Sequence, residues 1–223
     1  MAAVFSGKRV AGDFYDGFRA NSHRILFGLL DVAGRREDTR GILIATQTIF
    51  HNMGCTLFAK PDINESEALT ELCHLLNRNI LETAGAVRPC PAFLGCYNEQ
   101  LGTLCYTNAG HTPGLLRDHG GVVELASTGL PLGLFSHATS DSPTVALEPG
   151  AALLLVSRGV VEGKHKHKGD PEFALKHVKD LLRDDPLLDP KALCTSILNA
   201  IDESEYPSAV HDDETALAFV RKA

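Results

Sequence analysis

The chain has 223 residues, of which 44% are hydrophobic and 22% are charged. These proportions are ordinary for one globular domain and exclude a long disordered segment, so we expect a single domain over residues 1–223. The formal net charge of −7 leaves no basic surface for a phosphate backbone, so we expect no nucleic-acid partner. No secretory leader or membrane-spanning apolar run is visible, and the six cysteines form no CxxC pair, which predicts a cytoplasmic chain with reduced thiols and no membrane contact.

The first third of the chain predicts one buried strand and two helices. The short apolar run 25–30 has no helical period and ends at Asp31, as a strand running into a polar loop would. Between residues 37 and 58 apolar residues recur every three or four positions, which predicts a long helix with one buried face formed by Ile42, Ala45, Ile49, Met53 and Leu57. Asn64, with Glu67 three residues later, predicts the start of a second helix, whose buried stripe is Leu69, Leu72, Cys73, Leu76 and Ile80.

The rest of the chain predicts hairpins followed by helices. Short apolar runs alternate with turn residues between positions 91 and 125, a pattern typical of antiparallel hairpins. A buried strand is expected at 151–157, helices near Pro171 and at Pro190, and a last strand at 215–220. Because helices and hairpins come in blocks, the pattern favours an α+β sandwich of antiparallel sheets with helices on the outer faces.

Aspartates occur at strand ends or loops in three separate parts of the chain: Asp13 and Asp16, then Asp31, then Asp212 and Asp213. One interpretation is that they cap turns and helices, as aspartate often does. The other is that they gather from distant loops to bind hard cations such as Mg²⁺ or Mn²⁺, which prefer carboxylate oxygens. Their spacing by itself leaves both interpretations open.

Six motifs in order distinguish these interpretations: VAGDFYD, LLDVAG, TNAGHTPGLL, STGLPLGLF, ALLLVSRGVVE and DDETALAFVRK. Together they resemble the SpoIIE-like (RsbU-like) domain of the PPM-type, metal-dependent protein serine/threonine phosphatases, over about residues 10–222. The resemblance implies an α/β/β/α sandwich of two antiparallel sheets flanked by helices. It also implies a two-metal site, holding Mn²⁺ or Mg²⁺, at which water attacks phosphoserine or phosphothreonine without a covalent intermediate.

The resemblance also implies roles for particular residues. Asp31 is expected to bridge the two metal ions, and the backbone carbonyl of Val32 to contact the second ion. Asp13 is expected to serve that second ion directly or through water. Asp212 is expected to hold the first ion, with its neighbour Asp213 as a further candidate ligand. Asp31, Asp13 and Asp212 are therefore the predicted catalytic residues.

One residue departs from the family pattern. Where the family usually has TDG after the buried strand, this chain has Ser157, Arg158 and Gly159, so a cation replaces a ligand carboxylate. Two unit charges ~4 Å apart at an effective dielectric of ~20 interact by roughly 4 kcal/mol, and about twice that against a dication. Arg158 could therefore turn outward into solvent, or lie among Asp31 and Asp212 and take the place of an ion.

Histidines provide weaker candidates. His111 of the NAGH motif is interpreted as part of a structural turn that supports the site. His165 and His167 could form half of a Zn²⁺ or Ni²⁺ site, but without a third nearby ligand a solvated basic loop is favoured.

Two functions follow as hypotheses. The first is a Mn²⁺ or Mg²⁺-dependent phosphatase acting on a phosphoserine or phosphothreonine protein, such as an anti-anti-sigma-type regulator of bacterial signalling. The second is a degenerate pseudophosphatase that binds a phosphoprotein or regulates a partner with little turnover. Retention of Asp13, Asp31 and Asp212 favours the first, and Arg158 favours the second.

Overall fold

The structure is a computed structural model. It describes residues 2–6, 12–32, 36–85, 87–137, 140–162, 171–185, 189–202 and 213–222. The chain divides into two compact units. The middle unit contains residues 12–111 and 126–147, and the terminal unit contains residues 1–11, 112–125 and 148–223.

The described strands of the middle unit form one antiparallel sheet in the order β2-β3-β4-β5-β8. The strands are β2 (Asp13–Arg19), β3 (Arg24–Asp31), β4 (Ala92–Asn98), β5 (Thr103–Ala109) and β8 (Thr144–Ala146). β3 is paired along both edges, with β2 on one side and β4 on the other. Its apolar run is therefore a buried strand, as the sequence predicts.

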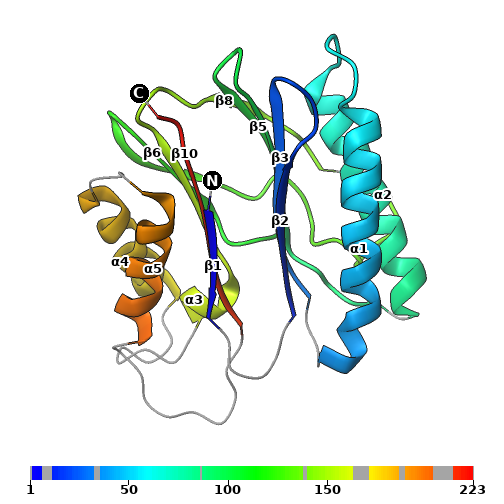
Figure 1. Ribbon diagram of the computed structural model, residues 1–223. Coiled ribbons are helices and arrows are strands. Elements are labelled where there is room, and N and C mark those ends of the chain that lie inside the picture. The colour runs from blue at the N-terminus through cyan, green and yellow to red at the C-terminus, as the bar shows by residue number, and fades with distance from the viewer. Residues whose placement is uncertain are drawn as a thin grey trace. The chain divides into compact units, whose positions relative to one another are not determined.

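Two long helices, α1 (Arg36–Leu57) and α2 (Glu65–Ala84), pack against each other and against this sheet (Figure 1). α2 begins where the sequence predicts, because the Asn64 Oδ1 atom accepts hydrogen bonds from the backbone N–H groups of Ser66 and Glu67, at 3.1 and 3.4 Å. It ends at Gly85, whose φ of 63° lies in the left-handed region that glycine adopts without strain.

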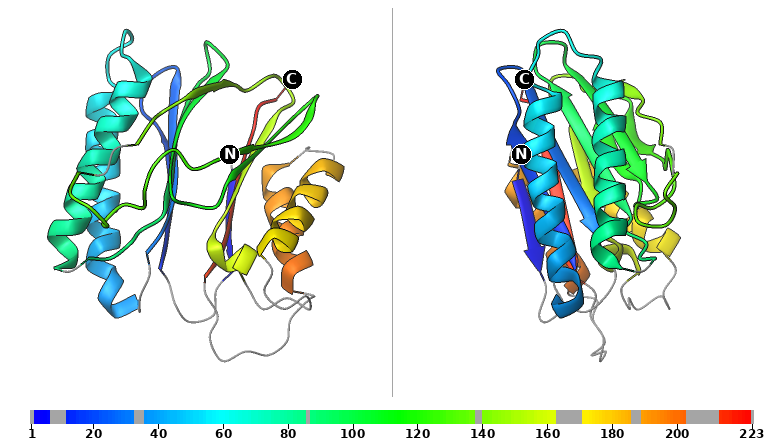
Figure 2. Two further views of the ribbon diagram at one scale, coloured as in Figure 1. Left: turned by 180° about the vertical axis from the view of Figure 1, so that it is seen from behind. Right: turned by 90° about the vertical axis from the view of Figure 1, so that its right-hand side faces the viewer.

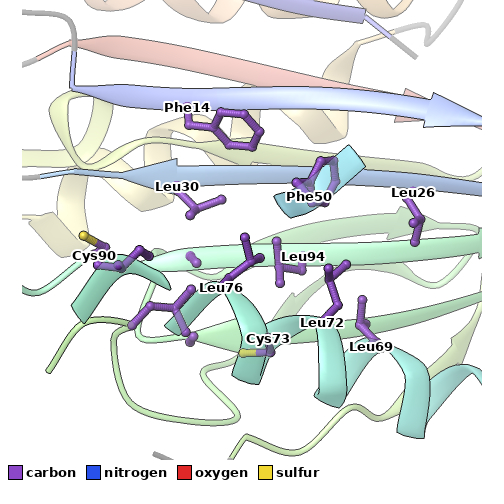
Figure 3. Packing of buried hydrophobic residues seen from close by; sticks show 14 of the residues in the cluster. Phe14, Leu26, Leu30, Phe50, Leu69, Leu72, Cys73, Leu76, Cys90 and Leu94 are labelled. Atoms are coloured by element: carbon purple, nitrogen blue, oxygen red, sulfur yellow. The ribbon is translucent and has the colours of Figure 1, made fainter. Parts of the chain in front are cut away.

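The core of the middle unit lies between these helices and one face of the sheet. Figure 3 shows Phe50 of α1 and Leu72 and Leu76 of α2 beside Leu30 and Leu94 of the strands. The predicted stripe of α2 is buried throughout. The buried stripe of α1 is shifted from the predicted one. Among its described residues Thr39, Ile42, Thr46, Phe50 and Gly54 are buried, whereas Ala45, Ile49, Met53 and Leu57 are partly exposed, the last three packing at the edge of the core. The Phe50 ring packs directly on β3, since a Cβ atom added to Gly28 would lie 3.5 Å from it.

The terminal unit has a second antiparallel sheet, whose described strands are ordered β1-β10-β9-β6-β7. The strands are β1 (Ala2–Ser6), β6 (Gly114–Asp118), β7 (Gly121–Leu125), β9 (Ala152–Val156) and β10 (Glu214–Val220). β10 lies between β1 and β9, so strands from the two ends of the chain are neighbours (Figure 1). β9 is buried along its whole length.

Three helices belong to the terminal unit: α3 (Arg158–Glu162), α4 (Pro171–Asp184) and α5 (Pro190–Asp202). α5 packs on β10 and β1, and α4 packs on β6 and β7 (Figure 2). Asp189 caps α5, since its carboxylate accepts from the backbone N–H groups of Lys191 and Ala192. The Arg117 guanidinium, carried by β6, donates to the carbonyl oxygens of Leu182 and Asp185 and so satisfies the last turn of α4.

The predicted fold class, two antiparallel sheets flanked by helices, is confirmed. The sequence did not predict β1, β8 or α3, each of which has only three to five residues, nor β2, which has seven. Such short elements carry too little periodicity to detect. The prediction of a single domain stays a prediction. Within the described ranges, none of the helices is long and apolar enough to cross a membrane.

A buried ion pair ties α2 to the sheet and gives the first testable prediction. Arg24 Nε lies 2.5 Å from Glu65 Oε1, and both side chains are nearly buried, at 8% and 12% exposed. The same carboxylate oxygen accepts from Asn98 Nδ2 at 2.6 Å. Arg24→Met leaves the Glu65 carboxylate buried without its cationic partner. We therefore expect the free energy of unfolding, measured by urea denaturation, to fall by about 3 kcal/mol.

The matched control is Arg19→Met. Arg19 pairs with Glu99 at 2.5 Å on the surface, where the side chains are 50% and 39% exposed. Exposed pairs contribute about 1 kcal/mol or less, so this variant should lose far less stability. Equal losses in the two variants would show that burial of Arg24 is not what gives the pair its effect.

The cysteines give a second prediction. All six are free thiols, and only Cys55 is exposed. Burial raises the pKa of Cys73 and Cys105 to about 11 and that of Cys90 to about 12, from an ordinary value of 9.0. A raised thiol pKa favours the folded state below pH 9, and this stabilisation is lost as the pH rises towards the pKa values of the folded protein. We therefore expect the free energy of unfolding to fall above about pH 9.

The same burial predicts thiol reactivity. At pH 8 we expect Ellman's reagent to titrate one thiol rapidly in the native protein and six in guanidinium chloride. Rapid reaction of a second native thiol would contradict the assignment.

Candidate functional site

The middle unit brings Asp13 and Asp31 directly opposite each other in the register of β2 and β3. The next pair outward is hydrogen-bonded, because the Val32 N–H donates to the Gly12 carbonyl at 2.9 Å. Hydrogen-bonded and non-hydrogen-bonded pairs alternate in antiparallel sheets, so Asp13 and Asp31 form a non-hydrogen-bonded pair with Cα atoms about 4.5 Å apart. Two carboxylates are therefore held side by side at one end of a sheet.

Both aspartates lie on the sheet face away from α1 and α2. Side chains alternate between the faces of a strand, and Leu30, next to Asp31, belongs to the core beneath the helices. Asp31 is 8% exposed, and Asp13 is partly exposed. Like charges directly opposite each other are destabilising, by roughly 3 kcal/mol for ~5 Å at an effective dielectric of ~20. A cation between the two carboxylates would turn this repulsion into attraction.

Asp16, the second aspartate of β2, faces the other way. Its Oδ2 atom lies 2.6 Å from Nε2 of His51 on α1, and its Oδ1 atom accepts the Gly17 N–H at 2.7 Å. The His51 ring stacks on Phe18, with ring centroids 4.3 Å apart. Asp16 therefore has a structural role between β2 and α1 and does not belong with Asp13 and Asp31.

The Val32 carbonyl lies at the same end of these strands. A Cβ atom added to Gly12 would come within 2.6 Å of the Val32 carbonyl oxygen, closer than real Cβ contacts allow. Only glycine lets the backbone before Asp13 approach this carbonyl so closely. Two carboxylates and a carbonyl oxygen form an oxygen-only donor set, which is the set that Mg²⁺ and Mn²⁺ prefer, so these residues fit the expected metal.

The terminal unit contributes a second acidic segment, which a serine hydroxyl holds in place. Ser157 Oγ donates to the Asp213 carbonyl at 3.0 Å and accepts the Thr215 N–H at 2.9 Å. The Ser157 N–H in turn donates to the Thr215 carbonyl at 2.9 Å. Ser157 is fully buried and Asp213 is 7% exposed. We call this set of bonds the Ser157 clasp; it fixes Asp213 beside the start of α3.

Arg158 is the first residue of α3 and directly follows the clasp. Its Nε atom lies 3.7 Å from Glu162 Oε2, one helical turn later, and the two side chains are 40% and 51% exposed. The Nε atom itself is buried although the side chain as a whole is 40% exposed, so the choice between the outward and inward alternatives stays a prediction. The inward alternative involves Asp212, which lies outside the described residues.

The candidate residues thus fall into two groups. Asp13, Asp31 and Val32 come together in the middle unit, and Asp213 and Arg158 come together in the terminal unit. In the part of the chain that the structure describes, no three His, Cys, Asp or Glu side chains form a metal-binding cluster. Their assignment as metal ligands stays a prediction, and His165 and His167 also lie outside the described residues.

Sequence reasoning missed three residues with a role around this site: Gly12, Ser157 and Glu162. The i,i+4 spacing of Arg158 and Glu162 could have revealed the ion pair if α3 had been predicted. Nothing in the sequence predicts the Ser157 clasp, because Asp213 and Thr215 lie more than 50 positions from Ser157.

Two further motifs are structural. The Asn108 Oδ1 atom accepts the His111 N–H at 2.8 Å, and the Asn108 carbonyl accepts the Thr128 N–H at 2.8 Å, so the NAGH turn holds the STGLPLGLF segment. Within that segment Gly133, at a φ of 72°, packs so close to the Arg88 carbonyl that no side chain would fit. His111 itself is buried, and its supporting role stays a prediction.

Comparison with solved structures defines the class of protein. The chain is similar to the RsbU and RsbW domains of Rv1364c from Mycobacterium tuberculosis, with a TM-score of 0.79 and 22% identity over 100% of this chain and 61% of that one. It is also similar to the PP2C phosphatase domain of SpoIIE from Bacillus subtilis, solved with a fragment of its regulatory domain, with a TM-score of 0.77 and 16% identity over 98% of this chain and 62% of that one. The fold is therefore that of the PPM-type (PP2C) protein phosphatases.

A family model described as Stage II sporulation protein E (SpoIIE) matches residues 21–222, so the chain belongs to the SpoIIE family. Among curated proteins it is similar to the phosphoserine phosphatase RsbP of Bacillus subtilis (strain 168), with 24% identity over 210 residues. That match covers 94% of this chain but 49% of RsbP, so the chain spans about half the length of this relative. The SpoIIE-like resemblance seen in the sequence is confirmed.

The Ser157 clasp gives a third prediction. Ser157→Ala removes a donor to the Asp213 carbonyl and an acceptor of the Thr215 N–H, both buried, so we expect the free energy of unfolding to fall by about 2 kcal/mol. Ser157→Thr keeps the hydroxyl and should stay within about 1 kcal/mol of wild type. Thr195→Ala removes an exposed helix hydroxyl in the same unit and should change stability by less than about 0.5 kcal/mol. Urea denaturation measures all three, and a wild-type value for Ser157→Ala would refute the clasp.

Proposed function

We propose that this domain is a Mn²⁺ or Mg²⁺-dependent phosphatase that removes phosphate from phosphoserine or phosphothreonine on a regulatory protein. The observation that carries the proposal is the placement of Asp13 directly opposite Asp31 at one end of β2 and β3. Like charges directly opposite each other in a sheet repel, and a cation between them would turn this repulsion into attraction. Membership of the SpoIIE family supports the same activity.

In this proposal Asp31 would be a ligand shared by the two metal ions, and Asp13 and the Val32 carbonyl would serve the second ion. Asp212, with Asp213 as a further candidate, would hold the first ion. When bound, the cations supply positive charge to the phosphoryl oxygens and make water a stronger nucleophile at neutral pH. The chain's own contribution is to hold these oxygen ligands in place, by sheet register around Asp31 and by the Ser157 clasp around Asp213.

The pseudophosphatase is the second candidate, and Arg158 favours it. A guanidinium stays charged at every working pH. Replacement of a ligand carboxylate by Arg158 removes a negative charge from the site and adds a positive one. Both changes lower the affinity of the site for a dication. In that case the domain would bind its phosphoprotein partner with little or no turnover.

The substrate class is proposed from the relatives. RsbP is by name a phosphoserine phosphatase, and the mycobacterial structure pairs an RsbU domain with an RsbW domain in Rv1364c. We propose a phosphorylated protein regulator, of the anti-anti-sigma type in a bacterial signalling system, as the substrate. The net charge of −7 favours a protein partner over a nucleic acid.

Hydrolysis of a phosphoserine peptide with Mn²⁺ tests the proposal. The variants are Asp31→Asn and Arg158→Asp, and Asp16→Asn is the matched control because its carboxylate contacts His51 instead of the proposed site. We expect metal-dependent turnover in wild type, a loss of about 100-fold or more in Asp31→Asn, and wild-type turnover in Asp16→Asn. Arg158→Asp should bind Mn²⁺ at least about tenfold more tightly in calorimetry.

Other outcomes separate the two candidates. No turnover in wild type, together with turnover in Arg158→Asp, supports the pseudophosphatase. If neither wild type nor Arg158→Asp binds Mn²⁺, the placement of the metal site is wrong and both the ligand set and the proposed mechanism fail.

A further inference from the structure

We propose that Gly12 is a positioning residue: the space left by its missing side chain sets where the Val32 carbonyl oxygen lies relative to the carboxylates of Asp13 and Asp31. This inference rests on the metal-dependent function proposed above. It concerns only the ligands proposed for the second ion, all of which lie within the described residues. Gly12 itself contributes no atom to that proposed ligand set.

The requirement for glycine at position 12 is one of space. The φ of Gly12 lies outside the left-handed region, so backbone conformation does not demand a glycine there. Gly12 is buried, and a Cβ atom added to it would lie 2.6 Å from the Val32 carbonyl oxygen. Close carbon–oxygen contacts are about 3.3 Å or longer, so an alanine would force the two backbones apart by about 0.7 Å. A backbone oxygen cannot avoid the contact by changing rotamer.

The Val32 side of this contact is held in place. The Val32 N–H donates to the Gly12 carbonyl at 2.9 Å, and the Asp31 N–H donates to the Pro91 carbonyl at 2.9 Å. The Val32 side chain is 1% exposed and belongs to the core beneath α1 and α2. The displacement caused by an alanine therefore falls on the short backbone segments that carry the proposed ligands. Either the Val32 carbonyl turns, or residues 12–13 move away from Asp31.

Both displacements change the same set of oxygens, and small ions are the more sensitive to such a change. Mg²⁺ demands near-ideal octahedral geometry with oxygens at about 2.0–2.1 Å, whereas Ca²⁺ accepts irregular sets at about 2.3–2.6 Å. Replacement of Gly12 should therefore weaken Mg²⁺ binding more than Ca²⁺ binding. A general loss of folding would weaken the binding of both ions alike.

The experiment is isothermal titration calorimetry of Mg²⁺ and of Ca²⁺ into wild type, Gly12→Ala and Gly28→Ala of the 223-residue chain. Gly28→Ala is the matched control, because Gly28 shares β3 with Asp31 and a Cβ atom there would meet the Leu94 side chain at 2.9 Å, in the core beneath the helices. Each variant is also made in the Arg158→Asp background, in which metal binding is expected to be tighter. We expect Gly12→Ala to weaken Mg²⁺ binding about tenfold and Ca²⁺ binding about threefold or less, and Gly28→Ala to change each by less than about twofold.

A second readout needs no metal. In metal-free, isotope-labelled protein the carbonyl ¹³C resonance of Val32 should shift further in Gly12→Ala than in Gly28→Ala. An equal or smaller shift in Gly12→Ala overturns the proposal, since the Val32 carbonyl would then not depend on the space at position 12.

The outcomes separate this proposal from the function beneath it. If Gly12→Ala binds Mg²⁺ as tightly as its parent chain, or loses affinity for Mg²⁺ and Ca²⁺ by the same factor, the role of Gly12 is wrong while the metal site stands. If Gly12→Ala shows no cooperative urea transition, the glycine serves folding instead, which also overturns the proposal. If neither wild type nor Arg158→Asp binds Mg²⁺ or Mn²⁺, the proposed function itself fails and the role of Gly12 fails with it.

Discussion

β3 must satisfy two demands that conflict. Its backbone is hydrogen-bonded along both edges and its residues are buried from Leu26 to Leu30, yet it ends in a nearly buried carboxylate, Asp31. Because the register of β2 then places Asp13 directly opposite, two like charges meet where desolvation is already costly. The apolar contacts beneath α1 and α2 stabilise this sheet strongly enough to hold such a pair in position. A different register would separate the two aspartates, but a shift by one residue would move the apolar side chains of the strand to the other face of the sheet.

The two acidic groups are held by different means. Around Asp31 the restraint is a ladder of backbone hydrogen bonds, which no single side-chain substitution removes. Around Asp213 it is the hydroxyl of Ser157, fully buried and bonded to two backbone groups. One substitution can therefore loosen the second group without disturbing the first. In metal sites generally, the hydrogen bonds that orient the ligand residues matter as much as the ligands themselves.

Arg158 gives this domain its particular electrostatic character. The chain carries a permanent cation directly after the Ser157 clasp. The exposed pair with Glu162 shows one way in which a short helix accommodates the charge, since α3 brings the two residues one turn apart. The fold by itself is compatible with both proposed functions, because function depends on the residues of the site and not on the fold.

The sequence by itself determined the elements with strong periodicity and clear boundaries. β3, α2 and α5 were predicted because a buried run ending in Asp31, the Asn64 cap and the Asp189–Pro190 start are local signals that act within one turn or strand. The ordered motifs also determined the family. The buried face of α1 was predicted less well, since Thr46 and Phe50 are fully buried whereas Ala45 and Met53 are partly exposed, and packing against the sheet decides which face is buried.

Only the tertiary structure decided which residues meet. Asp13 and Asp31 are 18 positions apart, and their direct opposition follows from the register of β2 and β3, which depends on backbone hydrogen bonds that no local pattern encodes. The separation of Asp16 from them follows from the alternation of side chains about the same strand. The Ser157 clasp joins segments more than 50 residues apart, and it exists because β9 and β10 are neighbours in a sheet. Local signals such as helix caps can be read from the sequence, whereas the pairing of distant segments depends on burial and hydrogen bonding across the whole sheet.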